Sequence, residues 1–359
     1  MKSSANKGVE MMVDNISKRK KNILKAIIQE HILTAEPVGS RTLAKNYDFG
    51  VSSATIRNEM ADLEDMGYLK QPHTSAGRIP SDKGYRFYVD VLMEQKKIIS
   101  TNLQQSLQKL YSEEKGVKDI ISATVKMVSN LTHYTAMVSE PQLEKSKIRK
   151  VQLLQVTSDS LMIILITDTG MVNNKIINLN QELSTKQIRY INNYLVDKLE
   201  GTNLQDLDKE FMKKLELELE KRINVSKKLI DLINDELEIL VEPTDFQIYL
   251  GGTSYILDQP EFNDLEKLKQ VLNILDTKDT LRQLLDSISE EGVEVKIGHE
   301  NQLEEIQNCS LVFATYSLNS KAVGKIGVIG PTRMKYPQVI STVDFVADML
   351  GEIISKSSR

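Results

Sequence analysis

The sequence predicts an α+β protein of several domains, and three observations lead to this fold class. The chain has 359 residues, which is enough for two or three separate cores. Residues 38–90 are typical of two short helices followed by a hairpin. Beyond them, strand-like apolar alternation occurs at 135–179 and again at 294–329, with a largely helical stretch between.

Composition narrows the class of protein further. With 40% hydrophobic and 27% charged residues, the chain is typical of a globular protein. Its longest apolar run, Leu161 to Ile166, is too short to cross a bilayer, and its first residues lack the apolar core of a secretory signal. The single cysteine, Cys309, excludes an internal disulfide and fits a reducing compartment. We therefore expect a cytoplasmic protein without membrane contact.

Charge is distributed unevenly along the chain. The net charge is −4, but residues 1–97 hold 16 Lys and Arg against 12 Asp and Glu, or +4. The remainder holds 30 against 38, or −8. A basic excess at one end and an acidic body are expected when one domain contacts phosphate and the others do not.

The first helix is expected from Ile16 to Ile32, after a polar tail at residues 1–16. Its apolar stripe is formed by Ile16, Ile23, Ile27 and Ile28. The cluster Lys18-Arg19-Lys20-Lys21 has two open interpretations, a solvated face or a clamp on phosphate. Pro37 prevents the helix from continuing.

A helix-turn-helix is predicted next. Ser40 can cap a first helix that ends near Tyr47, residues 49–51 form the turn, and Ser52 can cap the second helix. Gly67 suits the left-handed conformation that closes a helix. The second helix has one apolar stripe that must pack inward: Ile56, Met60, Leu63 and Met66.

The opposite face of that second helix is predicted to enter the major groove of DNA. It presents Ala54, Asn58 and Ala61, with Arg57 on its flank, and asparagine can bond adenine in a bidentate way. The acidic C-terminal half would repel phosphate. The start of the helix offers hydroxyl groups and free backbone N–H groups instead, so we expect the start to point at DNA.

A wing follows the second helix. Residues 68–71 and 78–80 are predicted to pair as short strands around a polar tip at 73–77. Arg78 and His73 could reach phosphate or a neighbouring minor groove, and Lys83 and Arg86 add positive charge just beyond. The alternative is an ordinary small α+β domain in which the hairpin only packs.

At these residues the chain resembles the heat-inducible transcription repressors of the HrcA family. The resemblance rests on the segment EPVGSRTLAKNYDFGVSSATIRNEMADLEDMGYLKQPHTSAGRIPSDKGYRFYVD, and above all on ATIRNEMADLEDMGYL followed by QPHTSAGRIP. Length and layout fit the family from end to end, although the C-terminal two thirds match by pattern more than by motif.

The resemblance implies a domain organisation. A winged helix-turn-helix DNA-binding domain would occupy residues 17–92, and a GAF-like antiparallel-sheet domain would combine 93–180 with 276–359. A largely helical inserted dimerisation domain would occupy 181–275. The pattern by itself indicates only that a helical segment separates two regions rich in strands.

The resemblance also implies a function and partners. The protein would be a homodimer that binds an inverted-repeat operator, the CIRCE element, on double-stranded DNA. It would block RNA polymerase at heat-shock operons encoding chaperones, as part of the stress response, with a GroE-type chaperonin maintaining its activity. The residues expected to contact DNA are Arg41, Ser52, Ser53, Ala54, Thr55, Arg57, Asn58, His73, Thr74, Ser75, Arg78, Lys83 and Arg86.

Other motifs favour no enzyme, cofactor or metal site. Asp168-Thr169-Gly170 matches the triplet of aspartic proteases, which act with a pair of such carboxylates. A β-turn is the simpler explanation, because it needs only Asp and Gly at turn positions. The glycine-rich stretches at 251–254 and 327–331 lack the lysine of a P-loop and the spacing of a dinucleotide fingerprint. The four histidines, His31, His73, His133 and His299, have no metal-ligand spacing.

Two further functions stay open at this stage. One is a small-molecule-gated DNA-binding regulator that senses an effector through the GAF-like domain. The other is a winged helix used only for protein contacts, which would show none of the salt dependence of DNA binding.

Overall fold

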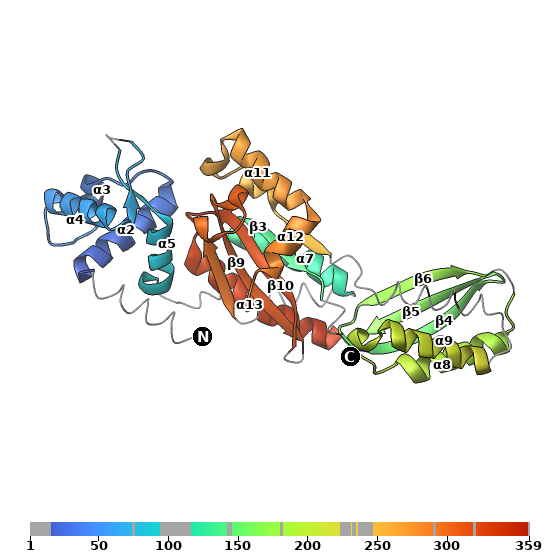
Figure 1. The fold of residues 1–359 in the computed structure, drawn as a ribbon. Helices are drawn as coiled ribbons and strands as arrows, with labels where there is room; N and C mark the ends of the chain where they lie inside the picture. The colour runs from blue at the N-terminus through green and yellow to red at the C-terminus, as the bar shows by residue number, and fades with distance from the viewer. Residues whose placement is uncertain are drawn as a thin grey trace.

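The computed structural model describes residues 16–73, 76–93, 116–141, 146–179, 182–222, 231, 235, 247–289, 292–318 and 321–357. The described parts form three lobes along the long axis of the molecule (Figure 1). The expected tail, apart from Ile16, lies outside the described residues. The sequence pattern also predicts helices at 98–111 and along Leu229, Ile233 and Leu237, and these lie wholly or mostly outside the described residues. None of the described helices combines the length and hydropathy needed to cross a membrane.

The first lobe, residues 16–93, has the predicted order of a helix, a helix-turn-helix and a hairpin. Ser17 caps the first helix by accepting a hydrogen bond from the backbone N–H of Lys20, and the buried stripe of that helix includes Ile23, Ile27 and Ile28. A final short helix begins after Ser81, which caps it through the N–H of Gly84. The elements are α2 (Lys18–Thr34), α3 (Ser40–Asn46), α4 (Ser53–Asp65), β1 (Leu69–Lys70), β2 (Ile79–Pro80), α5 (Asp82–Phe87) and the π-helical turn η1 (Tyr88–Leu92).

The middle lobe is a five-stranded antiparallel sheet with helices on both faces (Figure 1). Alternate residues of β9 and β10 divide between two cores. Val312 and Val328 join the core with α7 and α13, whereas Leu311 and Ile329 join the core with α11 and α12. The strand order is β7 (Ile248–Gly251), β3 (Thr135–Ser139), β10 (Lys321–Pro331), β9 (Cys309–Leu318) and β8 (Val293–Ile297). The helices are α7 (Val117–Thr132), α11 (Leu265–Asp276), α12 (Lys278–Asp286) and α13 (Tyr336–Ser357).

The third lobe is a separate three-stranded antiparallel sheet backed by two helices (Figure 1). Its strands are β4 (Ile148–Thr157), β5 (Ser160–Thr167) and β6 (Val172–Asn178), and its helices are α8 (Thr185–Leu199) and α9 (Lys209–Arg222). Along β5, Leu161, Ile163 and Leu165 are buried, while the residues between them stay partly accessible. A capping box of Ser184 and Gln187 fixes the start of α8.

This arrangement corrects the expected grouping of the strands. The GAF-like domain implied by the resemblance contains the strands at 148–179 as well as those at 294–329, but the two groups pair in different sheets. Strand β7 and helix α11, expected inside the inserted segment, belong to the middle lobe. The reason is physical: alternation reports that a strand is half buried, but the same pattern is compatible with any partner strand.

The aromatic core of the first lobe depends on an unprotonated His31. Its Nδ1 lies 2.7 Å from the hydroxyl of Tyr85, and burial, together with the nearby positive charge of Arg333, lowers the pKa of His31 from 6.5 to about 4. The unfolded chain therefore binds a proton at His31 that the folded chain rejects between these two values.

We expect the free energy of unfolding to fall as pH drops from about 6.5 to 4, with about 3 kcal/mol of the loss due to His31. His31→Asn should flatten this part of the pH profile, measured by urea unfolding at several pH values. His133→Asn is a matched control, because His133 is exposed at the end of α7. Equal profiles for the wild type and His31→Asn would contradict the prediction.

Candidate nucleic-acid interface

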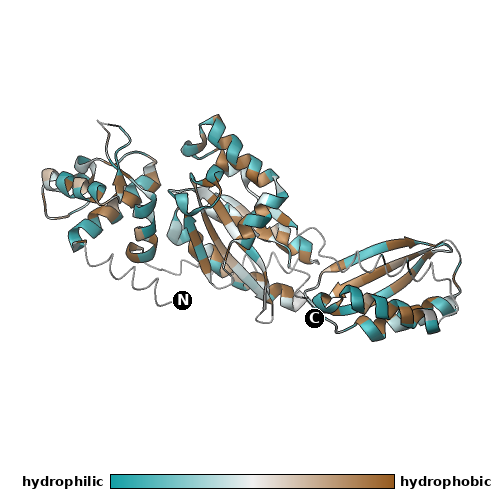
Figure 2. Ribbon diagram, in the orientation of Figure 1, coloured by the Kyte–Doolittle hydropathy of each residue, from teal (hydrophilic) through white to brown (hydrophobic). Residues whose placement is uncertain are grey.

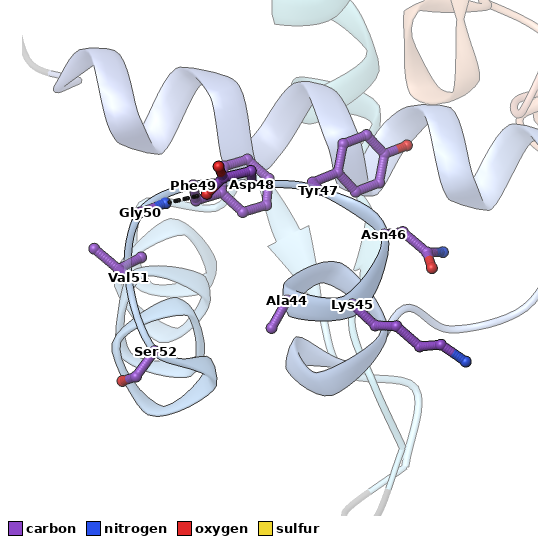
Figure 3. Close-up of a pocket in the computed structure, with 9 residues that line it drawn as sticks. All are labelled: Ala44, Lys45, Asn46, Tyr47, Asp48, Phe49, Gly50, Val51 and Ser52. Carbon is purple, nitrogen blue, oxygen red and sulfur yellow. Dashed lines mark hydrogen bonds between the residues drawn. The ribbon is translucent and has the colours of Figure 1, made fainter.

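The turn between α3 and α4 is held by local hydrogen bonds (Figure 3). The side chain of Asp48 accepts from the N–H of Gly50 at 3.0 Å, and Gly50 adopts a φ of +66°, which glycine tolerates best. The rings of Tyr47 and Phe49 stack with centroids 5.7 Å apart. A shallow hollow lined by residues 44–52 runs along this turn. The expected cap at Ser40 is wrong, because Gly39 precedes α3 without a side-chain cap.

Helix α4 divides into a buried and an exposed face. Ser52 caps it, its hydroxyl oxygen accepting from the N–H of Thr55 at 3.2 Å. Ile56, Met60 and Leu63 are buried in the core that α4 shares with α2. Ala54, Arg57, Asn58 and Ala61, the face predicted from the sequence, are exposed, and so are Asp62 and Asp65 in the C-terminal half.

Acidic side chains of α4 are neutralised by cations from neighbouring elements. The guanidinium of Arg19 pairs with Glu59, and Nζ of Lys20 lies 2.9 Å from a carboxylate oxygen of Asp62. Two members of the basic cluster at 18–21 are therefore engaged by α4 and form neither a free solvated face nor a phosphate clamp. Their positive charge offsets the acidic half of α4 and reduces its repulsion of phosphate.

The hairpin after α4 is anchored at its base. Leu69 lies opposite Pro80 and Lys70 opposite Ile79, and beyond these pairs the backbone of Arg78 exchanges two hydrogen bonds of 2.9 Å with Val38. Gly77 lies so close to this contact that a Cβ there would come within 2.4 Å of the Val38 carbonyl oxygen. The hairpin is thus fixed against the segment that leads into α3.

The residues predicted to contact DNA differ in how exposed they are. Arg41, Ser52, Ala54, Arg57, Asn58 and His73 are exposed, Ser53 and Thr55 are half-buried beside them, and Thr74 and Ser75 lie outside the described residues.

Three predicted cations are held by partners inside the protein. Nε of Arg78 lies 2.7 Å from a carboxylate oxygen of Glu64. Lys83 donates to the carbonyl of Met66 at 2.8 Å and lies over the ring of Tyr68. Arg86 pairs with Glu300 of the middle lobe.

Lys45 is a further cation near the site that is not among the residues predicted to contact DNA. It is exposed on α3 and borders the hollow that also contains Ser52 (Figure 3). Lys45 follows Arg41 by four residues, so both project from one side of α3. That spacing could have identified it.

Comparisons with known proteins show the family to which this chain belongs. The family model described as the HrcA protein C-terminal domain matches residues 118–340. A protein of Pelotomaculum thermopropionicum is 43% identical over 95% of this chain and 97% of its own length. One of Thermoanaerobacter sp. is 42% identical over 94% and 96%. Both carry the name heat-inducible transcription repressor HrcA.

A solved structure shares the fold. It is described as a hypothetical protein at 2.2 Å resolution, and it covers 96% of this chain and 100% of its own with a TM-score of 0.67 and 24% identity.

The names of the sequence relatives define the class of protein, which is that of transcription repressors. This chain belongs to the HrcA family of heat-inducible transcription repressors.

The cap at Ser52 gives a first test of the site. Ser52→Ala removes the acceptor for the Thr55 N–H and should lower the free energy of unfolding by about 1 kcal/mol. Ser53→Ala, one residue along, is the matched control and should change it little. Urea unfolding of both variants measures the difference, and equal losses would contradict the capping role.

Proposed function

We propose that this protein is a homodimeric repressor that binds an inverted-repeat operator and thereby excludes RNA polymerase from heat-shock operons. Membership of the HrcA family supports the regulatory role. The observation that carries the DNA-binding mode is the exposed face of α4, where small side chains and Asn58 lie clear of the core. In this proposal the first lobe is a winged helix-turn-helix, and the operator is the CIRCE element.

The start of α4 is the end that enters the major groove in this proposal. The N–H groups of Ser53 and Ala54 in its first turn have no partner within the helix and lie under the positive end of the helix dipole, which favours an approach to phosphate. Arg41 and Lys45 on α3 add exposed cations beside it. Arg57 would contact the backbone and Asn58 a base, since amide side chains match the edge of adenine.

Salt titration and footprinting test the DNA-binding mode. If the exposed cations contact phosphates, the logarithm of the binding constant should fall with the logarithm of salt concentration, by about 0.9 for each phosphate contact. Footprinting should reveal protection with two-fold symmetry. If the protein shows no salt-dependent binding to the duplex, the result would indicate that the winged helix is used for protein contacts only.

Asn58→Ala should weaken binding to the cognate operator by about 1–3 kcal/mol and leave binding to random DNA nearly unchanged. The reason is that a base contact contributes only where its base is present. Asn273→Ala is the matched control, since Asn273 is exposed on helix α11 of the middle lobe. Titration of fluorescent duplexes measures both affinities. Equal losses on the two duplexes would contradict a base contact for Asn58.

The proposed dimer rests on the outer face of the third lobe. Strand register brings apolar side chains of three strands together there, with Leu154 opposite Met162 and Met162 opposite Ile176. Four residues of this lobe's strands are among the exposed large hydrophobic residues: Leu154, Val156, Val172 and Ile176. Leu161 and Ile163 alternate with Met162 along β5 and are buried, so they point to the opposite side of the sheet. Helices α8 and α9 cover one side of this sheet (Figure 2). An apolar sheet face left open to water favours association with a second copy.

A change on this face tests the dimer. Ile176→Glu places a charge where 49% of the side chain is exposed, so the monomer should fold while the dimer loses stability. Leu257→Glu is the control, because Leu257 is an exposed apolar residue of the middle lobe. Analytical ultracentrifugation should show a shift to monomer for Ile176→Glu alone. An unchanged dimer would place the interface elsewhere.

The domain boundaries follow the sheets in this proposal. The inserted dimerisation segment would begin near residue 142 and end near 246, so that β4, β5, β6, α8 and α9 belong to it. The middle lobe would be the GAF-like domain. A GroE-type chaperonin as partner stays a prediction from the family resemblance.

The packing of the middle lobe favours repression without a small-molecule effector. Glycines of β10 face aromatic rings: a Cβ at Gly327 would come within 1.9 Å of the ring of Phe313, and one at Gly324 within 2.3 Å of the Tyr316 hydroxyl oxygen. The rings therefore fill the space over these glycines. Nothing in this packing supports the alternative of a regulator gated by a small molecule.

A further inference from the structure

The first and middle lobes meet through charged and polar side chains around α5. The carboxylate of Asp82 accepts from the backbone N–H of His299 at 3.1 Å and lies 2.6 Å from Nδ1 of the same residue. Arg86 donates two hydrogen bonds to the carboxylate of Glu300 and one to the carbonyl of Val295. We call Asp82, Arg86, Gly298, His299 and Glu300 the lobe contact.

The close approach at the lobe contact depends on a glycine. Gly298 has a φ of +55°, and a Cβ at this position would come within 2.2 Å of a carboxylate oxygen of Asp82. Any larger residue would therefore strain its own backbone and also push α5 away from the middle lobe. A backbone conformation that favours glycine, at this close approach of the two lobes, indicates a specific contact between them.

An aromatic contact lies beside the lobe contact. Tyr85 of α5 and Tyr336 of α13 are both fully buried, with ring centroids 5.9 Å apart. Arg333, just before α13, donates to the carbonyl of Ile32 in α2 and is held from the other side by Glu261. An apolar centre with a polar rim is the usual anatomy of a specific interface.

The lobe contact is linked to the end of α4 by a short chain of hydrogen bonds. The hydroxyl of Ser81 donates to the carbonyl of Gly67 at 2.6 Å, and Lys83 donates to the carbonyl of Met66. Ser81 and Lys83 are the sequence neighbours of Asp82. The end of the proposed recognition helix is thus fixed to the same turn of chain that docks on the middle lobe, and α5 lies on the side of the first lobe that faces the sheet (Figure 1).

We propose that the lobe contact positions the two copies of α4 in the dimer for the two halves of the operator. This inference rests on the proposed function. After one first lobe has bound its half-site, the second binds with an effective concentration set by geometry. A fixed lobe orientation raises that concentration at one half-site spacing and lowers it at others. The five residues act as positioning residues and touch no base.

Gly298→Ala tests the proposal as a wedge in the full-length protein. It should leave affinity for a single half-site unchanged within about twofold but weaken binding to the CIRCE inverted repeat about tenfold. It should also lose less affinity than the wild type when the half-sites are moved apart by one or two base pairs. This dependence on spacing is a readout that general destabilisation would not produce.

Two controls accompany the wedge. Gly292→Ala introduces the same backbone strain, at a φ of +68°, where a Cβ would meet nothing within 4 Å. It should bind the operator like the wild type. Glu300→Arg opposes two cations at the lobe contact and should reproduce the effect of the wedge, and the added change Arg86→Glu should restore binding. Circular dichroism melting confirms that each variant is folded.

The outcomes separate the inference from the function. Equal losses on the half-site and the inverted repeat, unchanged binding, or tighter binding by Gly298→Ala would overturn the positioning role while the wild type still binds its operator. Failure of the wild type to bind either duplex would overturn the proposed function and this inference with it.

Discussion

Burial of one stripe of α4 is the constraint on which the rest of the first lobe depends. Ile56, Met60 and Leu63 have to leave water, and α2 supplies the apolar surface that receives them. Because side chains on a helix point in fixed directions, this burial leaves Ala54 and Asn58 outside. The proposed reading face is thus exposed by the hydrophobic effect before any ligand is present. No other structural feature is needed to expose this face of α4.

The second constraint is electrostatic, because a protein with a net negative charge has to approach a negatively charged ligand. The whole chain carries a net charge of −4, and α4 itself contains several carboxylates. The answer in this structure is local pairing: Arg19, Lys20 and Arg78 each meet a carboxylate of α4. Such pairs contribute little to stability when they are exposed, about 1 kcal/mol or less. Their larger effect is on the potential at the helix surface, which decides whether phosphate is repelled.

Patterns confined to a few neighbouring residues could be predicted from the sequence. The turn at Gly50, the cap at Ser52 and the hairpin after Gly67 are fixed by local backbone chemistry, and all three occur in the structure. The partners of the strands could not be predicted, because an apolar pattern does not specify which strand pairs with which, and β4 and β9 pair in different sheets. The role of Arg86 was equally hidden. Its partner Glu300 lies 214 positions away, and only the folded chain brings them together.

The arrangement of the three lobes connects these local features to repression. The proposed reading helix and the proposed dimer face lie in different end lobes of an elongated chain (Figure 1), so any two-fold operator has to be matched through the middle lobe. A flexible connection would tolerate many spacings and gain little from the second half-site. A contact built on buried aromatic rings, an Arg–carboxylate pair and an obligatory glycine restricts the orientation instead. Under the proposed function, specificity for an inverted repeat would be a property of the whole chain, and the packing of the middle lobe would contribute to it as directly as the residues proposed to face the DNA.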